Sequence, residues 1–458
     1  MKRLLKYILI ASISCVFLIY ALMSGFLWWS EANLPKDSGL GSLHINSEEQ
    51  HKLLLIDSGK EGLKRRIDAI ESAQTTIELE YFIYELDLAS QIITQKLIEA
   101  ASRGVEIKIL VDFSAPVFKL RPQYASFLNK YGIKVRYYNT APLFQFINIQ
   151  HRSHRKFLIV DSKTVITGGR NIGSDYFDLS THYNFLDTDI QVTGPIVKDI
   201  RKSFNSYWES SLASEPELIT ETITGFVNQT EVKRVLSSLD AQIFPKAEFE
   251  CNNIDFVTDS PGLELKNRKV YSYLENKLAS AKESVFGESP YFVLRPDGLN
   301  LLASLAERNI KQTYLTNSLY STDAYYTVSA FLPVADNLLD LGIKLYLYNG
   351  KALEPDHQSR WGLHAKRAVI DGRHTLIGTY NIDPRSANLN SEVLISCNDN
   401  ELLAKRVLSS MKSRRKNAWQ LQDAKSDVYT VITKEAAWRQ KIKMLVVLPL
   451  AKIFDFLL

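Results

Sequence analysis

Strand-like and helix-like patterns alternate along most of the chain. In the first half, period-two or continuous apolar runs predict strands, and apolar residues at helical spacing predict helices. The predicted strands are TTIELEYFIY, VEIKILVDF, IKVRYYN, KFLIVD and TVITGG, and the predicted helices span 87–103 and 122–131. The second half gives a similar series, with strands at ESVFGESPYFV, KQTYLTN, IKLYLYN, KRAVID and HTLIG and helices over 297–308 and 324–341. Such alternation favours an α/β sandwich in each half.

One set of polar and glycine positions occurs in both halves at constant spacing. The set is His154, Lys156, Asp161, Gly168 and Asn171 in the first half and His364, Lys366, Asp371, Gly378 and Asn381, each 210 residues later, in the second. Two copies of this length indicate two similar lobes rather than a solenoid. We therefore predict two similar α/β-sandwich lobes related by a pseudo-twofold axis, over 48–212 and 251–422, joined by a connecting segment over 213–250.

The two ends of the chain are more apolar than the rest. The 23 residues from Tyr7 to Trp29 carry no charge and follow three cationic residues. As a helix they would be roughly 34 Å long, enough to cross a bilayer. We predict an uncleaved transmembrane anchor over 1–30, with its N-terminus in the cytoplasm by the positive-inside rule. The apolar tail over 423–458 is too short and interrupted to span a membrane, and either packs on the core or lies in the membrane interface.

Composition and charge exclude several classes of protein. A chain of 458 residues with 45% hydrophobic and 23% charged residues is globular and long enough for two lobes. A net charge of +4 is too small to indicate a nucleic-acid partner. The three cysteines lie far apart, and neither a disulfide framework nor a metal site can be read from their spacing.

The repeated motif has the groups that phosphoryl transfer needs. In His-x-Lys both side chains point to the same face of a strand. Imidazole can attack phosphorus or move protons near neutral pH, lysine supplies positive charge, and asparagine supplies a neutral donor. A single motif of this kind usually lies on the solvated surface and has no catalytic role, whereas two equally spaced copies indicate a function. Because a displacement needs both a nucleophile and an acid, we predict that His154 and His364 face each other across one cleft. Neither copy has zinc-like spacing, and we predict no metal or other cofactor.

Both copies resemble the His-x-Lys-x4-Asp motif of the phospholipase D superfamily, and the similarity covers nearly all of residues 50–420. Within it, GGRNIGSDYF and NIDPRSANLNSE look like the bacterial cardiolipin synthases, most closely the shorter cardiolipin synthase C class of Gram-negative bacteria. The motif is highly specific for the superfamily and less specific for the class.

The resemblance implies a covalent phosphohistidine mechanism. His154 would attack phosphorus, and His364 would protonate the departing alcohol and then activate the incoming hydroxyl. The near symmetry leaves open which histidine attacks, and the assignment follows what is usual in the family. The lysines and asparagines of both copies, Lys156, Lys366, Asn171 and Asn381, would hold the phosphate oxygens.

The resemblance also assigns supporting roles to four acidic residues. Asp161 and Asp371 belong to the motif and are expected to support the strands and the cleft rather than the chemistry. Glu392 resembles the acid that orients a family histidine, and Asp189 looks like its counterpart in the first lobe. An unrelated strand-end hydrogen bond is the alternative for both.

Two departures from the family pattern accompany the motifs. The usual Gly-Ser after each motif is Gly168-Gly169 in the first copy and Gly378-Thr379 in the second, so a first-lobe hydroxyl is missing. Glu80 stands where the class more often has an amide, which indicates either an altered head-group preference or a surface salt bridge.

The resemblance implies a membrane-anchored phosphatidyltransferase. It would move a phosphatidyl group from phosphatidylglycerol or phosphatidylethanolamine to the hydroxyl of phosphatidylglycerol, giving cardiolipin. Its place would be the bacterial inner membrane, with the catalytic domain in the periplasm. A hydrolase with water as the acceptor is one alternative, since the motifs do not distinguish transfer from hydrolysis. An anchored nuclease is another, but apart from KSRRK at 412–416 no basic run is present, so a nucleic-acid partner is not expected. Donor lipid and oligomeric state are not encoded in any of these patterns.

Overall fold

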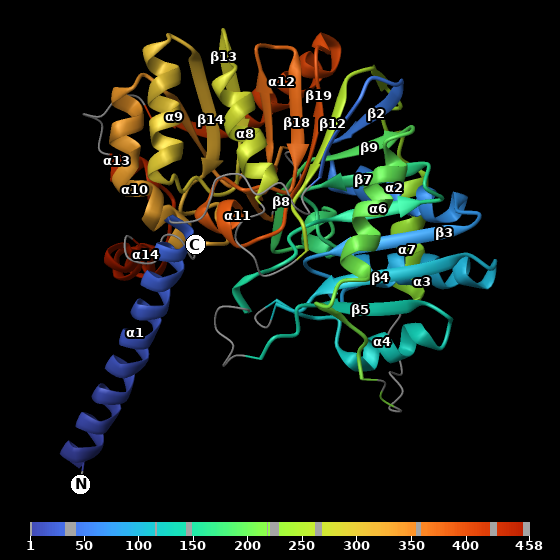
Figure 1. The fold of residues 1–458 in the computed structure, drawn as a ribbon, viewed down its shortest axis with the longest axis horizontal. Helices are drawn as coiled ribbons and strands as arrows, with labels where there is room; N and C mark the ends of the chain where they lie inside the picture. The colour runs from blue at the N-terminus through green and yellow to red at the C-terminus, as the bar shows by residue number, and fades with distance from the viewer. Residues whose placement is uncertain are drawn as a thin grey trace.

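The computed structural model describes residues 2–32, 43–114, 117–142, 149–217, 219, 229–261, 268–353, 359–421 and 428–451. Within these ranges the strands form two mixed sheets of nine strands and one two-stranded ladder. Figure 1 shows the two large sheets on opposite sides of the molecule, one built from the blue-to-green half of the chain and the other mainly from the yellow-to-red half.

The sheet of lobe 1 has the order β10-β5-β4-β3-β6-β7-β9-β2-β11. Its strands are β10 (Ala213–Ser214), β5 (Lys134–Tyr138), β4 (Glu106–Asp112), β3 (Thr76–Tyr81), β6 (Phe157–Val160), β7 (Thr164–Gly168), β9 (Asp189–Thr193), β2 (His51–Ile56) and β11 (Glu248–Cys251). Strands β3, β4 and β5 are parallel, whereas β6, β7 and β9 are antiparallel. Helices α2 (Gly59–Ser72), α3 (Leu88–Ser102) and α4 (Pro122–Asn129) cover one face of this sheet through an apolar core that includes Ile67, Leu97 and Leu128.

Lobe 2 repeats this order strand for strand as β20-β15-β14-β13-β17-β18-β19-β12-β1. Its strands are β20 (Ala418–Leu421), β15 (Lys344–Tyr348), β14 (Lys311–Asn317), β13 (Ser284–Glu288), β17 (Arg367–Ile370), β18 (His374–Gly378), β19 (Val393–Cys397), β12 (Ile254–Thr258) and β1 (Leu43–Ser47). Helices α8 (Lys269–Ala279), α9 (Pro296–Glu307), α10 (Tyr325–Asp340) and α13 (Val428–Ile432) pack with it in a second core. The prediction of two similar α/β lobes is confirmed.

The two lobes exchange edge strands. Strand β1 precedes all of lobe 1 in sequence, yet it pairs with β12 in the sheet of lobe 2. Strand β11, at the end of the expected connecting segment, pairs with β2 in lobe 1. That segment also contains β10 and helix α7 (Gln229–Asp240), while residues 218 and 220–228 lie outside the described ranges. A disulfide joins Cys251 of β11 to Cys397 of β19, so a covalent bond also crosses between the lobes.

Two helices fill the space between the sheets. Helix α6 (Val197–Trp208) and helix α12 (Glu401–Arg415) contribute Ile200, Phe204, Val407 and Met411 to one buried apolar cluster. The same cluster contains residues of both large sheets, such as Ile190 of β9. The lobes therefore share a continuous core, which fixes the position of one relative to the other.

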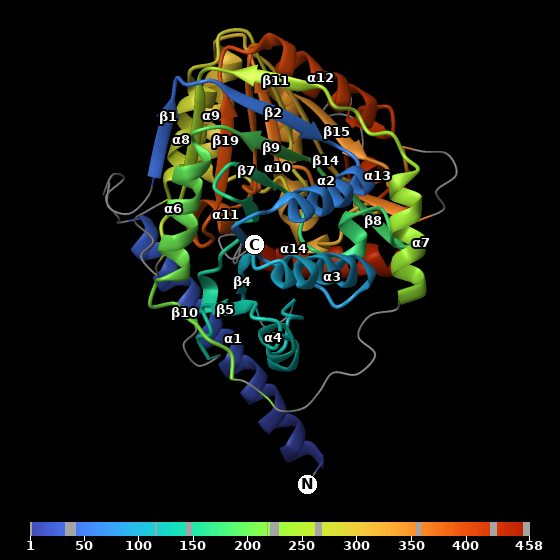
Figure 2. The same ribbon diagram turned by 90° about the vertical axis from the view of Figure 1, so that its right-hand side faces the viewer.

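The terminal segments are helical where they are described. Helix α1 (Lys2–Ala32) extends away from the lobes in both views (Figures 1 and 2), and its Leu9, Ile13 and Phe17 are exposed. Over the part of the chain that the structure describes, no helix combines the length and apolar content that a membrane crossing requires. The predicted transmembrane helix is thus not supported.

Helix α14 (Trp438–Ala451) packs on α10, where the Ser329 hydroxyl donates to the carbonyl of Met444 at 2.9 Å. Its other face exposes Trp438, Ile442, Leu445 and Val446. The described part of the tail therefore packs on the protein, which was the first of the two expectations for it. Residues 422–427 and 452–458 lie outside the described ranges.

Candidate active site

Residues of both lobes line one cavity of about 760 Å³ between them. His154 and Asn171 of lobe 1 and His364 and Asn381 of lobe 2 all contribute to its wall. Tyr20 of α1 also lines this cavity. The structure thus brings together the two histidines that lie 210 residues apart in the chain.

His154 is held by contacts with the opposite lobe. Its backbone N–H donates to the carbonyl of Ser391 at 3.0 Å, and Ser391 donates in return to the carbonyl of Arg152 at 2.8 Å. Its Nδ1 lies 3.0 Å from both carboxylate oxygens of Glu392. That carboxylate also accepts hydrogen bonds from the hydroxyls of Ser386, at 2.8 Å, and Thr379. With Nδ1 engaged, Nε2 is the ring nitrogen available to the cavity.

His364 is held in the reciprocal way. It follows β16 (Arg360–Leu363), which pairs in parallel with β8 (Tyr183–Leu186) of lobe 1, and its backbone N–H donates to the carbonyl of Leu186 at 2.8 Å. Its Nδ1 lies 2.5 Å from Oδ2 of Asp187. Each histidine therefore takes its carboxylate from the other lobe, so neither lobe alone contains a complete histidine–carboxylate pair.

The carboxylate on His364 is Asp187, and the sequence-based choice of Asp189 was wrong in this respect. Asp189 lies in β9 and pairs instead with Arg66 at 2.8 Å and Arg170 at 3.3 Å. The repeat spacing does not locate this acid, because Glu392 follows Asn381 by 11 residues whereas Asp187 follows Asn171 by 16, and residues 187–189 offer two aspartates. A loop inserted in one copy shifts the acid without changing its place in space.

The missing first-lobe hydroxyl has a steric reason. A side chain at Gly169 would collide with the carboxylate of Asp187. In the second copy, Thr379 occupies the matching position and its hydroxyl donates to Glu392. The two copies therefore hold their carboxylates differently, one by close backbone approach and the other by a hydroxyl.

The motif aspartates lie in turns away from the cavity. Asp161 accepts hydrogen bonds from the backbone N–H groups of Gln74, Thr75 and Thr76 at 2.8–2.9 Å. Asp371 makes the same contacts with residues 282–284 at the start of β13. Both have positive φ angles, 53° and 52°. They support the strands, and the geometry assigns them no contact with reacting groups.

A family model described as cardiolipin synthase, PLD-like domain, matches residues 67–208 and 274–414, one match in each lobe. The chain belongs to the phospholipase D superfamily. Within the superfamily it is cardiolipin synthase-like, and the resemblance predicted from the motifs is confirmed.

The chain is also similar to two further proteins and to one solved structure. Cardiolipin synthase C of Escherichia coli K12 is 26% identical over 421 residues, covering 81% of this chain and 86% of that protein. An uncharacterized Helicobacter pylori J99 protein is 30% identical over 429 residues, 84% of each chain. The crystal structure of phosphatidylserine synthase from Haemophilus influenzae superposes with a TM-score of 0.65 over 95% of this chain and 100% of that one, and at 15% identity it speaks for the fold alone.

In this phospholipase D-like site the motif lysines lie directly behind the histidines. Nζ of Lys156 donates to the carbonyl of His154 at 2.7 Å, and Nζ of Lys366 donates to the carbonyl of His364 at 2.5 Å. Burial lowers the pKa of Lys156 to about 7 and that of Lys366 to about 8. An anionic phosphate near them would favour their charged forms.

The two histidine–carboxylate pairs differ electrostatically. Burial and the adjacent lysine lower the pKa of His154 well below its ordinary value, and the same causes lower that of His364 to about 4. Burial opposes ionisation of Asp187, but His364 and Lys366 lower its pKa to about 2. Burial raises the pKa of Glu392 to about 7. Asp187 is thus the more acidic of the two carboxylates, and it lies on His364.

Sequence reasoning missed two arginines of the site and misjudged one acid. Arg152 and Arg385 line the cavity. Neither is repeated, but Arg152 lies two residues before His154 and Arg385 lies in the family-like segment NIDPRSANLNSE, which are the signals that could have found them. Glu80, which lies at the end of β3, is buried and pairs with Arg155 at 3.0 Å. It also accepts a hydrogen bond from the Ser153 hydroxyl at 2.7 Å. It therefore forms a buried ion pair, and neither expected role, at the head group or on the surface, describes it.

Proposed function

We propose that the protein is a phosphatidyltransferase that forms cardiolipin from phosphatidylglycerol and a donor phospholipid through a phosphohistidine intermediate. The observation that carries the proposal is the reciprocal pairing in one cavity: His154 with Glu392, and His364 with Asp187. Two rings with Nδ1 engaged leave two Nε2 atoms to act on one phosphorus, which is what a double displacement requires.

In the first step, Nε2 of His154 attacks phosphorus and the bond from phosphorus to the donor's head-group oxygen breaks. His364 gives its proton to that oxygen, so the head group leaves as a neutral alcohol. The pKa of the free His364 ring, about 4, is too low for this task at neutral pH. Binding of the phosphodiester anion beside the ring raises that pKa, because negative charge favours the imidazolium.

In the second step, neutral His364 takes the proton of the acceptor hydroxyl. The oxygen attacks phosphorus from the side that the head group left, and the bond to His154 breaks. The product is the new phosphodiester, and His154 returns to its starting form. The lysines and the asparagines of both motifs would stabilise the negative oxygens in both steps.

The difference between the two carboxylates supports the assignment of His154 as the nucleophile. An acid–base catalyst must hold a proton in one step and release it in the other, and a permanently ionised neighbour stabilises the imidazolium. Asp187, with a pKa of about 2, meets this requirement better than Glu392, with a pKa of about 7. His364 is therefore the better acid and base.

We also propose that the enzyme works at a membrane surface in an oxidising compartment. Helix α14 exposes Trp438, Ile442 and Val446 along one face, with cationic Lys443 beside them, a pattern that suits the lipid interface. The disulfide between Cys251 and Cys397 suits the periplasm, where such bonds persist. Both observations support the expected location of the catalytic domain.

Lipid analysis of the purified protein tests the proposal. In mixed micelles of phosphatidylglycerol, with and without phosphatidylethanolamine, the expected product is cardiolipin. His154→Ala and His364→Ala should each abolish turnover with an unchanged circular dichroism spectrum, and His374→Ala, a histidine outside the motifs, should not. Phosphatidic acid as the sole product would favour the hydrolase, and cleavage of DNA without lipid turnover would favour the nuclease.

A further inference from the structure

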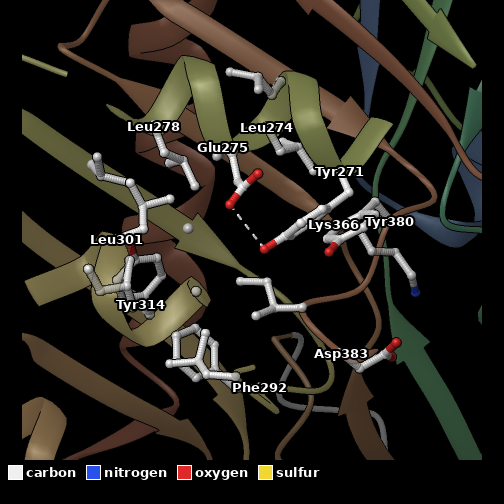
Figure 3. Close-up of a pocket in the computed structure, with 18 of the residues that line it drawn as sticks. Tyr271, Leu274, Glu275, Leu278, Phe292, Leu301, Tyr314, Lys366, Tyr380 and Asp383 are labelled. Carbon is white, nitrogen blue, oxygen red and sulfur yellow. Dashed lines mark hydrogen bonds between the residues drawn. The ribbon is translucent and has the colours of Figure 1, made fainter. Parts of the chain in front are cut away.

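Lobe 2 contains a second, apolar cavity under helices α8 and α9 (Figure 3). In the close-up, Leu274 and Leu278 of α8 border the space opposite Leu301, Tyr314 and Phe292. Its volume is about 120 Å³. Apolar cavities of roughly 150 Å³ are known to stay dry and to bind a benzene-sized ligand, so this one can hold a short run of methylene groups.

The apolar cavity adjoins the active site. Lys366 and Asp383 lie at one end of it, as Figure 3 shows, and Asp383 also lines the cavity that contains both histidines. The ammonium group of the same lysine contacts the backbone of His364. An acceptor whose hydroxyl lies beside His364 can therefore extend its apolar part past Lys366 into lobe 2.

The matching place in lobe 1 is filled. In lobe 1, Leu79 of β3 lies opposite Leu158 of β6, and both belong to the buried core. In lobe 2 the corresponding strands place Gly287 opposite Ala368, and both line the cavity. Two leucines in lobe 1 thus correspond to a glycine and an alanine in lobe 2. The ring of Tyr314 packs against Gly287, and the short side chain of Ala368 leaves part of the space beside it open.

A second difference makes the space in lobe 2 apolar. Asp189 lies opposite Gly168 in lobe 1 and forms ion pairs with two buried arginines, one of which is Arg170. The residue opposite Gly378 in lobe 2 is Leu394, which lines the cavity. Arg170 itself corresponds to Tyr380, another lining residue, at the repeat offset of 210. An ionic network in one lobe is therefore replaced by an apolar wall in the other.

We propose that this cavity binds a segment of one fatty-acyl chain of the acceptor lipid. The inference rests on the proposed function, in which the acceptor hydroxyl enters on the side of His364, and the cavity lies in the same lobe, next to Lys366. A chain segment held by the cavity wall would position the acceptor hydroxyl beside His364, whereas water and glycerol have no chain to be held in this way. The cavity thereby makes transfer to a lipid more efficient than transfer to a soluble alcohol.

Filling the cavity tests this inference. Ala368→Leu restores the residue type that lobe 1 has at Leu158, and Ala69→Leu, on half-buried Ala69 of α2 away from both cavities, is the matched control. The measurement is the ratio of transfer to long-chain phosphatidylglycerol over transfer to glycerol from one donor. Ala368→Leu should lower this ratio about tenfold, which corresponds to a loss of about 1.4 kcal/mol in the binding that positions the acceptor. Ala69→Leu should leave it unchanged.

Leu301→Ala provides a second variant in the opposite direction, since it enlarges the cavity and should shift the preferred acceptor to longer chains. A ratio that Ala368→Leu leaves unchanged, or a chain preference that Leu301→Ala leaves unchanged in a folded protein, would overturn the inference.

A binding experiment separates this inference from the proposed function. Decyl phosphate and butyl phosphate, below their micellar concentrations, are titrated calorimetrically into the wild-type protein and the Ala368→Leu variant. The wild type should bind the decyl compound more tightly, and the variant should lose most of that advantage. If the wild type forms no cardiolipin but keeps this pattern, the proposed function fails and the chain site stands. Equal affinity of the wild type for both compounds refutes the chain site, whatever the outcome of the lipid assay.

Discussion

Replacing Asp187 by asparagine separates the roles of the two histidines. In the structure, Nδ1 of His364 lies 2.5 Å from the carboxylate of Asp187. The asparagine has the same size and can keep this contact, but it has no negative charge. The pair is buried, so solvent screens the charge only weakly. The expected effect is a lower pKa of the His364 imidazolium and a smaller fraction of enzyme able to protonate the leaving group.

The size of the effect follows from the geometry. A contact of this length puts the two charge centres roughly 4 Å apart, where unit charges attract by about 4 kcal/mol at an effective dielectric constant of 20. Each 1.36 kcal/mol is a factor of ten in a proton equilibrium, so the turnover number with a natural phospholipid should fall on the order of 10³-fold. Binding of the lipid should change much less.

The assay uses a phosphatidyl ester of p-nitrophenol beside the natural substrate. p-Nitrophenolate leaves without being protonated, so the first step with this ester needs the nucleophile but not the acid. Asp187→Asn should therefore release p-nitrophenolate in a rapid burst of about one equivalent per enzyme, followed by slow turnover. His154→Ala should give no burst.

A reversed pattern would refute the assignment. If Asp187→Asn abolishes the burst while Glu392→Gln retains it, His364 is the nucleophile. If Asp187→Asn turns over the natural lipid at the wild-type rate, the carboxylate has no part in proton transfer. Unchanged thermal unfolding of the variant would show that the loss is not one of folding.

Three further predictions concern other features of the site and fold. Burial lowers the pKa of Lys156 to about 7 and that of Lys366 to about 8, so kcat/KM should fall as pH rises through these values and the two charges are lost; a flat profile up to about pH 10 would contradict this. Gly169→Ser should displace the Asp187 carboxylate and reduce turnover as strongly as Asp187→Asn does. Wild-type activity would show that the loop accommodates the added side chain without moving this carboxylate. Serine at both Cys251 and Cys397 should lower the free energy of unfolding by about 2–5 kcal/mol in denaturant titrations, with activity retained under native conditions, and an unchanged midpoint would mean that the bond does not form in solution.

The sequence predicts the parts of this structure that depend on local pattern and on the repeat. The run TTIELEYFIY contains β3, and the helices expected over 87–103 and 297–308 are α3 and α9. Local apolar periodicity determines such elements, and the internal repeat links the two halves without any knowledge of their packing. The pair of histidines in one cavity follows from the same repeat.

Long-range partners could not be predicted in this way. The exchange of β1 and β11 between the lobes and the disulfide at Cys251 depend on which strand edges meet, and no local pattern encodes that. Asp187 was missed because an insertion shifts it relative to the repeat. The predicted membrane anchor rested on the length of the uncharged run and on the cationic residues before it, and no described helix meets the requirements for a crossing.

The divergence of the two lobes away from the motif fits the order of events in a double displacement. In the proposed mechanism the phosphatidyl group stays on His154 between the two steps, while the alcohols that leave and enter both pass His364. The lobe that contains His364 has the apolar cavity beside Lys366, and its histidine has the permanently ionised partner Asp187. In lobe 1 the matching space is closed by Leu79 and by the ion pairs of Asp189, which make a rigid support. A symmetric enzyme would treat donor and acceptor alike, so under the proposed function we expect these departures from symmetry to favour transfer to a lipid over hydrolysis.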